Sequence, residues 1–332
     1  MSFQSGSATG PVDLLQQLAT WLVGIGWTQD RNAVEGSGWT FSGHKSGNYA
    51  HLRATVNEAS VWQHEFGSPG YVLNLYLGTG FSSGSLWNAQ AGAPIGSASN
   101  PIGVAMHLSA GPFSNYYFFA DSGGDNVVVV VEKTPGLYVH LGWGNSLVKA
   151  GSWTGGPYFF GSTAGYYSAY PSAGANTPGF TSTSDCPFPH TEGIGGGCGF
   201  VRADVDSFTG NWIGICGGSV GADQGFTGKR GDPSTPSSGS GSQATSIIQF
   251  LQVGSSTDMS QCTTSSLDGR ANLLPILLWA LRDGTSTGFS LLGSPPFIFY
   301  SNGVGHGFAN AEEYTIGPTT YKMFPNFAVV KQ

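Results

Sequence analysis

The strongest constraint on the fold is a stretch of strand-forming residues between positions 116 and 156. At its centre are five consecutive valines, Val127–Val131, which follow an aromatic run, Tyr116–Ala120, and a Gly-rich turn. A second turn leads to another apolar run, Leu137–Trp143. β-Branched and aromatic residues favour strands, and short runs bounded by turn residues argue against a helix. We therefore predict an antiparallel meander whose valine strand, which lacks a polar face, lies mid-sheet with both faces covered.

Charged residues are rare, at 9% of the 332 residues, compared with roughly 25% in a typical soluble domain. The chain holds 53 glycines, but its 39% hydrophobic and 13% aromatic residues indicate a folded chain rather than a disordered one. A soluble protein with so few charges tends to cover its surface with partners. The composition therefore favours a subunit of an assembly over a lone monomer.

The charge pattern and hydropathy disfavour several classes of partner. The formal net charge is −7 and no basic cluster is longer than Lys229-Arg230, so direct nucleic-acid binding is not expected. No apolar run approaches the roughly 20 residues of a membrane-spanning helix, so we expect no membrane partner. The first residues lack the pattern of a secretory signal, which predicts synthesis in a cytoplasm with reduced cysteines.

Periodic apolar residues predict one amphipathic helix, over Val12–Val23. Pro11 is favourable in its first turn, and Gly24 and Gly26 are favourable at its end. For residues 1–11 we predict a flexible arm. The helix is expected to pack on a sheet, and docking to a partner is the alternative. Its apolar face consists of Leu14, Leu18, Trp21, Leu22 and Ile25.

After residue 27 the apolar spacing changes to two, which is typical of strands. The clearest strands before the meander are Tyr49–Val56, Tyr71–Leu77 and Ile102–Leu108, with a long Gly/Ser/Ala loop at Gly78–Pro101. The alternation in the first of these places Ala50, Leu52, Ala54 and Val56 on one face and Tyr49, His51, Arg53 and Thr55 on the other.

The whole pattern predicts a mainly β fold, an antiparallel meander or sandwich with one N-terminal helix and a long Gly/Ser-rich insertion. Residues 12–156 would form the β domain, 157–244 the loop-rich insertion, and 245–332 a C-terminal β segment that completes the core. The insertion contains the low-complexity stretch Gly228–Ser242. Pro275 within the apolar run Leu273–Leu281 favours an edge or bulged strand, with a helix beginning at Pro275 as the alternative.

Three cysteines and one histidine are candidate zinc ligands. Cys186, His190, Cys198 and Cys216 are spaced C-x3-H-x7-C-x17-C, which differs from compact zinc motifs. We therefore predict no metal and no cofactor. Disulfides formed in an oxidising exterior and plain buried thiols both remain open, and Cys262 stands apart.

Signatures of catalysis are weak. Two segments match G-x-S-x-G, Gly80–Gly84 and Gly284–Gly288, but neither has the preceding strand and following helix of a nucleophile elbow. The nearest approach to paired carboxylates is Glu312-Glu313, whose side chains would point to opposite faces of a strand. We predict a protein that is not an enzyme.

Aromatic residues that follow the meander are the predicted interface with neighbouring subunits. Tyrosine is common both at protein interfaces and on sugar-binding surfaces, and we favour the interface. The predicted residues are Trp153, Tyr158, Phe159, Phe160, Tyr166, Tyr167 and Tyr170.

Two segments together resemble virion structural proteins of tailed bacteriophages. The first is Tyr138–Gly161, which carries a His-Phe/Leu-Gly and a Lys-x-Gly-x-Trp-x-Gly-Gly pattern in His140, Gly142, Lys149, Gly151, Trp153, Gly155 and Gly156. The second is the C-terminal part, with matches in Leu274-Pro275-Ile276, Leu291–Pro296, Tyr314–Gly317 and Tyr321–Pro325. The likeness covers about half of the chain, and its motifs are structural.

The resemblance implies a component of the neck, tail or baseplate and carries no catalytic residues. We therefore expect a virion protein, made in the host cytoplasm, whose partners are its own copies in a ring or collar and other tail or neck proteins. One alternative is a receptor- or glycan-binding tail protein that contacts the host surface through residues 157–245. The other is a virion-associated hydrolase of cell walls or polysaccharides.

Overall fold

The computed structural model describes residues 1–58, 70–93, 102–144, 156–166, 198–205, 208–216, 244–247, 273–281, 289–301, 308–325 and 327–331. Within these ranges the fold is mainly β, with one α-helix, α1 (Pro11–Gly24), and three sheets. The strand pairings are antiparallel except for a short parallel contact between β13 and β14. The predicted fold class is therefore confirmed.

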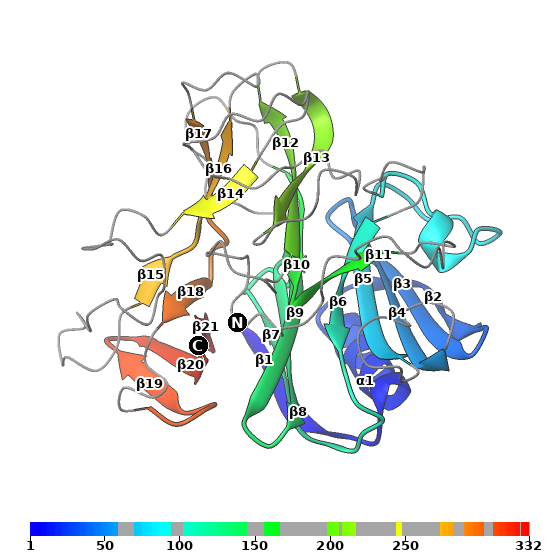
Figure 1. Cartoon of the computed structure of the whole chain (residues 1–332), viewed down its shortest axis with the longest axis horizontal. Helices are drawn as coiled ribbons and strands as arrows, with labels where there is room; N and C mark the ends of the chain where they lie inside the picture. Colours follow the sequence, from blue (N-terminus) through cyan, green and yellow to red (C-terminus); the bar gives the residue numbers. More distant parts are fainter. Residues whose placement is uncertain are drawn as a thin grey trace, which may run out of the picture.

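The three sheets lie as successive layers, which are seen side by side in Figure 1. The central sheet has the order β1 (Ser2–Ala8), β7 (Phe113–Ala120), β8 (Val127–Thr134), β9 (Leu137–Gly144), β10 (Tyr158–Gly161), β12 (Cys198–Val205), β13 (Phe208–Cys216), β14 (Ala244–Ile247), β16 (Leu277–Leu281), β17 (Phe289–Gly293). The helix-side sheet has the order β11 (Thr163–Tyr166), β6 (Ile102–His107), β5 (Gly70–Gly78), β4 (Asn48–Glu58), β3 (Gly38–Lys45), β2 (Thr28–Glu35). The C-terminal sheet has the order β15 (Leu273–Pro275), β18 (Ile298–Ser301), β21 (Phe327–Val330), β20 (Thr319–Phe324), β19 (Glu313–Ile316).

The valine strand β8 is the middle of this arrangement. Its side chains alternate between two hydrophobic clusters because successive residues of a strand point to opposite faces. Val127, Val129 and Val131 belong to the cluster shared with α1 and the helix-side sheet. Val128 and Val130 belong to the cluster shared with the C-terminal sheet, which includes Phe324 and Val329. All five valines are fully buried, so the prediction of a central strand covered on both sides is confirmed.

Helix α1 begins and ends within one residue of its predicted bounds. Gly10 is its N-cap residue and Pro11 lies in the first turn. Asp13 accepts hydrogen bonds from the Thr9 amide (2.7 Å) and hydroxyl (3.1 Å), which satisfies polar groups at the start of the helix. The burial of the leucines confirms the predicted apolar face; the residues buried are Pro11, Leu14, Leu15, Leu18, Ala19, Trp21 and Leu22.

Two predictions about chain organisation are corrected. Residues 1–11 are not a flexible arm, because Ser2–Ala8 forms β1 and pairs with β7. The boundary at 157 does not separate the core from an insertion, because β10 pairs with both β9 and β12 in the central sheet. The low-complexity stretch 228–242 lies outside the described residues. Around Pro275 the chain leaves one sheet for another: β15 is an edge strand of the C-terminal sheet, and β16 belongs to the central sheet.

The first testable prediction concerns β8. Val129→Asp should abolish soluble folding, because a buried unpaired carboxylate costs several kcal/mol, about the whole margin of a typical domain. Val34→Asp is the matched control, since the Val34 side chain is 67% exposed at the edge of the helix-side sheet. Soluble yield and thermal melting measure both variants. A Val129→Asp protein that melts like the wild type would contradict the central position of β8.

Candidate functional site

The outer face of the helix-side sheet is the most elaborate polar region among the described residues. In β4, Ala50, Leu52 and Ala54 join the hydrophobic cluster around α1, as their spacing predicts. His51 and Arg53 alternate with them and therefore point to the other face. That second face is buried as well, with His51 fully inaccessible and Arg53 4% exposed. It is a polar layer inside the protein rather than a solvated surface.

The loop of residues 79–93, which contains the short 3-10 helix η1 (Trp87–Ala89), contacts this polar layer. Its ends are joined by a hydrogen bond from the Thr79 amide to the Ala91 carbonyl (2.8 Å). Gln90 holds the loop from within: its Nε2 donates to the carbonyls of Ser82, Ser85 and Leu86 at 3.0–3.1 Å, and its Oε1 accepts from the Ser82 amide at 2.6 Å. One amide side chain that is 4% exposed thus fixes the backbone of the whole turn.

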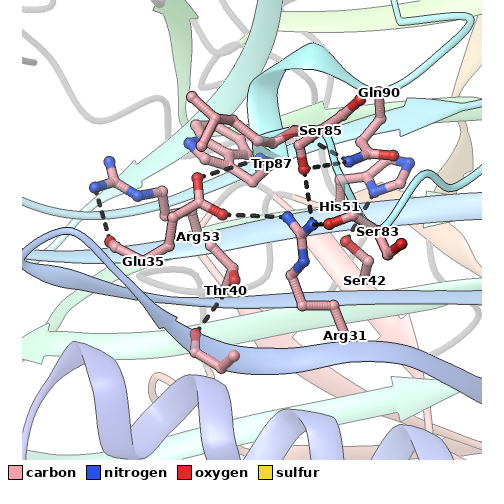
Figure 2. A network of polar contacts seen from close by, with 12 residues as sticks. Arg31, Glu35, Thr40, Ser42, His51, Arg53, Ser83, Ser85, Trp87 and Gln90 are labelled. Carbon is pink, nitrogen blue, oxygen red and sulfur yellow. Dashed lines mark hydrogen bonds and ion pairs between the residues drawn. The ribbon is translucent and has the colours of Figure 1, made fainter.

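Arg31 of β2 holds the same loop from the strand side, as Figure 2 shows. Its Nη2 donates to the carbonyls of Ser85 (2.7 Å) and Ser83 (2.9 Å), and its Nη1 pairs with Glu35 Oε2 (3.2 Å). Glu35 Oε1 in turn accepts from the Trp87 amide at 3.2 Å. The guanidinium also lies over the Phe81 ring, 5.2 Å from its centroid. We call this arrangement the loop clamp: Arg31, Glu35, Tyr76 and Gln90.

Tyr76 completes the loop clamp from β5. Its hydroxyl donates to the Trp87 carbonyl and accepts from the Gln90 amide at 3.3 Å. Burial raises the pKa of Tyr76, so the phenol stays protonated and remains a donor at neutral pH. The backbone of the loop is therefore held by hydrogen bonds from two strands, β2 and β5, and from its own Gln90.

His51 and Ser42 lie beside the loop clamp and share a hydrogen bond between Nδ1 and Oγ of 3.0 Å. Desolvation lowers the pKa of His51 to about 3, and the ring is therefore neutral at physiological pH. A histidine beside a serine is the pairing that activates a nucleophile in hydrolases. Here both side chains are fully buried, so this pair offers no nucleophile to a substrate in solution.

The segment Gly80–Gly84 that matches G-x-S-x-G lies in the clamped loop. It follows strand β5 but is succeeded by η1 rather than by the helix that a nucleophile elbow requires. The Ser82 backbone is held by Gln90 through both its amide and its carbonyl. The match therefore reflects a Gly/Ser-rich turn. The second match, at 284–288, lies outside the described residues.

The predicted aromatic interface is corrected in part. Tyr158, Phe159 and Phe160 form β10 and are fully buried inside the chain, so they are core residues and present no surface to a neighbouring subunit. Tyr158 also donates a hydrogen bond to Asn126 Oδ1 (2.8 Å). The backbone of Tyr166 pairs in β11. Trp153, Tyr167 and Tyr170 lie outside the described residues.

The four candidate zinc ligands and the separate Cys262 are only partly described. Cys198 and Cys216 are opposite each other in the backbone register of β12 and β13, and Cys186, His190 and Cys262 lie outside the described residues. Over the part of the chain that is described, no group of three or more His, Cys, Asp or Glu residues could hold a metal ion. In the same part, no helix is long and apolar enough to cross a membrane.

Comparison with known proteins adds no assignment. No protein-family model matches the sequence, and a search of curated proteins finds no match.

Sequence reasoning missed the loop clamp. The run TQDRNAVE of β2 shows no apolar alternation, so neither the strand nor its Arg31 is apparent from periodicity. A usable signal is nonetheless present. In a chain with 9% charged residues, an arginine and a glutamate four positions apart are conspicuous, and Arg31 and Glu35 do pair.

The second testable prediction concerns Gln90. Gln90→Ala leaves the Ser82 amide and several loop carbonyls without their partner, and each buried unsatisfied group costs about 1–3 kcal/mol. We expect a lower free energy of unfolding in urea and faster amide hydrogen exchange across residues 79–93. Gln16→Ala, on the more exposed side of α1, is the control. Unchanged exchange in the loop would contradict the role of Gln90.

The third prediction concerns acid sensitivity. An unfolded histidine has a pKa near 6.5, whereas the pKa of His51 is about 3, so the unfolded chain binds the extra proton between these values. The contribution of the neutral His51 to the free energy of unfolding is therefore fully present above about pH 6.5. It decreases as the pH is lowered, by at most about 1.4 kcal/mol per pH unit for this one histidine. His107, whose pKa burial lowers to about 4, adds to this dependence.

Urea unfolding between about pH 7 and about pH 5 tests this linkage. The His51→Gln variant should lose less stability over that interval than the wild type, because glutamine does not titrate. Equal losses in the two proteins would show that His51 is as readily protonated in the folded chain as in the unfolded one.

Proposed function

We propose that this chain is a non-enzymatic structural subunit of a tailed-phage virion, packed in multiple copies as a ring in the neck, tail or baseplate. The proposal is supported by the resemblance of its motifs and by the way the chain uses its few charges. The observation on which the proposal mainly rests is the use of the charges, because it comes from contacts in the structure.

The charged side chains of the described residues are largely engaged within the chain. Some are paired with each other and others bind backbone groups. The ion pairs are Arg31 with Glu35, and Lys322 and Lys331 with Glu313, and Asp30 shares a hydrogen bond of 2.8 Å with the His44 ring. The charged side chains that form hydrogen bonds with backbone groups are Asp13, Lys45, Asp121, Glu132 and Glu312.

The remaining surface of the described residues is made largely of uncharged residues. Bringing two such surfaces together does not strand unpaired charges in a low-dielectric interface, which is a main cost of association between charged surfaces. Repeated packing of identical subunits therefore suits this chain. Closed cyclic symmetry is the usual way to repeat a single contact without forming fibres.

The motif residues of the phage resemblance that the structure describes have packing roles. At Gly142 an added Cβ would lie 2.6 Å from the Val127 carbonyl oxygen and 2.5 Å from the Phe160 ring, so only glycine fits between these strands. The backbone amide of His140 donates to Ser162 Oγ at 2.7 Å, and both residues are fully buried. These residues maintain the fold. Motif residues that serve packing are what we expect of a structural protein.

The fourth prediction tests the proposed function directly. Quantitative mass spectrometry of purified phage particles should find this protein at a fixed copy number, which we expect to be a multiple of three or six, because a closed ring repeats one contact a fixed number of times. Non-structural proteins from the same lysate serve as the control for contamination. Absence from particles while the gene is expressed would reject the virion assignment. About one copy per particle would retain the virion assignment and reject the ring.

A further inference from the structure

Two of the four cysteines of the chain occupy one register position of the central sheet. Cys198 is the first residue of β12, Cys216 is the last residue of β13, and the two lie directly opposite each other in the antiparallel pair. Figure 1 shows these two strands side by side beyond β10. The cysteines are at the open end of the pair, whereas Val205 and Phe208 are opposite each other at its other end.

The separation of opposite residues in such a pair suits a disulfide. Their Cα atoms are about 5.5 Å apart in a hydrogen-bonded pair and about 4.5 Å apart in a non-hydrogen-bonded pair. A disulfide requires Cα atoms that are about 4.4–6.8 Å apart, so both types of pair meet the requirement. Opposite residues also belong to the same face of the sheet. The register of β12 and β13 therefore places Cys198 and Cys216 at a bonding separation without movement of the backbone.

The two strands differ in how they are anchored. Strand β12 pairs with β10, and there the Phe200 ring stacks on the Phe159 ring with centroids 5.0 Å apart. On its far side, β13 meets β14 at one register position of the described residues, Ile215 opposite Ala244. A covalent bond at Cys216, next to Ile215, would fix this end of β13 to the better anchored strand.

We propose that Cys198 and Cys216 form a disulfide that locks the open end of the β12–β13 pair when the protein meets a small disulfide such as oxidised glutathione. The thiolate of one cysteine attacks the small disulfide, which forms a mixed disulfide and releases one glutathione thiol. The thiolate of the other cysteine then attacks the protein sulfur of the mixed disulfide and releases the second glutathione thiol. Two protein thiols are thus oxidised, and their two electrons and two protons pass to glutathione.

The pairing pattern separates this inference from chance pairing. In an unfolded chain, short loops close at a lower entropic cost, so Cys198 would pair mainly with Cys186, which is nearer to it in the sequence than Cys216 is. In the folded chain, the strand register favours Cys216 instead. The inference goes beyond the proposed function, because it concerns a bond within one copy of the chain.

Peptide mapping of the full chain tests the pairing. The folded protein is equilibrated with reduced and oxidised glutathione, the free thiols are blocked by alkylation, and the chain is cleaved after Lys, Arg and Glu. This cleavage separates Cys198, in residues 193–202, from Cys216, in residues 203–229, and from the other two cysteines. We expect mass spectrometry to find these two peptides joined, and we expect the preference for this pair to be lost in urea.

Thermal melting tests whether the bond stabilises the fold. A cross-link restricts the unfolded chain, so the oxidised wild type should melt at a higher temperature than the reduced wild type. The shift should be absent in Cys198→Ser and in Cys216→Ser. It should persist in the matched controls Cys186→Ser and Cys262→Ser, which keep both members of the proposed pair.

Four results would overturn the inference. The first is a Cys198 that is linked mainly to Cys186 or Cys262 in the folded protein. The second is a Cys198 that remains a free thiol or carries only glutathione at equilibrium. The third is the same preference for Cys216 in urea, which would show that the register is not its cause. The fourth is a melting temperature that does not differ between the oxidised and reduced wild type.

Discussion

The structure depends on the burial of both faces of β8. A strand with five valines has no side to present to water, so it is stable only between two apolar layers. The helix-side sheet with α1 supplies one layer, and the C-terminal sheet supplies the other. At roughly 1.5–3 kcal/mol for each fully buried valine, this strand alone accounts for a large hydrophobic contribution, which offsets the entropy of ordering several long-range strand pairings.

The polar layer beneath the loop clamp obeys the opposite constraint. Buried polar groups are tolerated when they are hydrogen-bonded, and the clamp meets this condition by directing Arg31, Glu35, Tyr76 and Gln90 at backbone groups of the loop. Such a layer adds less stability than an apolar one of the same area. The polar layer does, however, fix the orientation of the loop backbone, because hydrogen bonds are directional and apolar contacts are not. The loop is accordingly held in one conformation.

Local patterns in the sequence predict α1, the meander and the alternation of β4, because each of these is determined by residues close together in the chain. The edge strand β1 and the position of β10 are not predictable in this way. Residues 2–8 have no alternation, and they form a strand because β7 offers a complementary edge more than a hundred positions away. Aromatic residues such as those at 158–160 are common at protein interfaces, which is why the sequence predicts a surface there, yet these residues of β10 are fully buried. In both cases the deciding information is the long-range pairing.

The scarcity of charge also determines how specificity can arise. Charged surfaces steer association over distances comparable to the Debye length and exclude wrong partners by repulsion. Over the described residues, where most charged side chains are engaged within the chain, selectivity must come instead from shape and from fixed hydrogen-bonding groups. Rigid local features then contribute more to affinity than total contact area does. A mobile loop would lose conformational entropy on binding, and this loss would offset the free energy gained from its contacts. The loop clamp is a feature of this rigid kind, and so are Gln4 and Gln17, which are both hydrogen-bonded to the Tyr116 hydroxyl; each depends on hydrogen bonds between segments far apart in the chain.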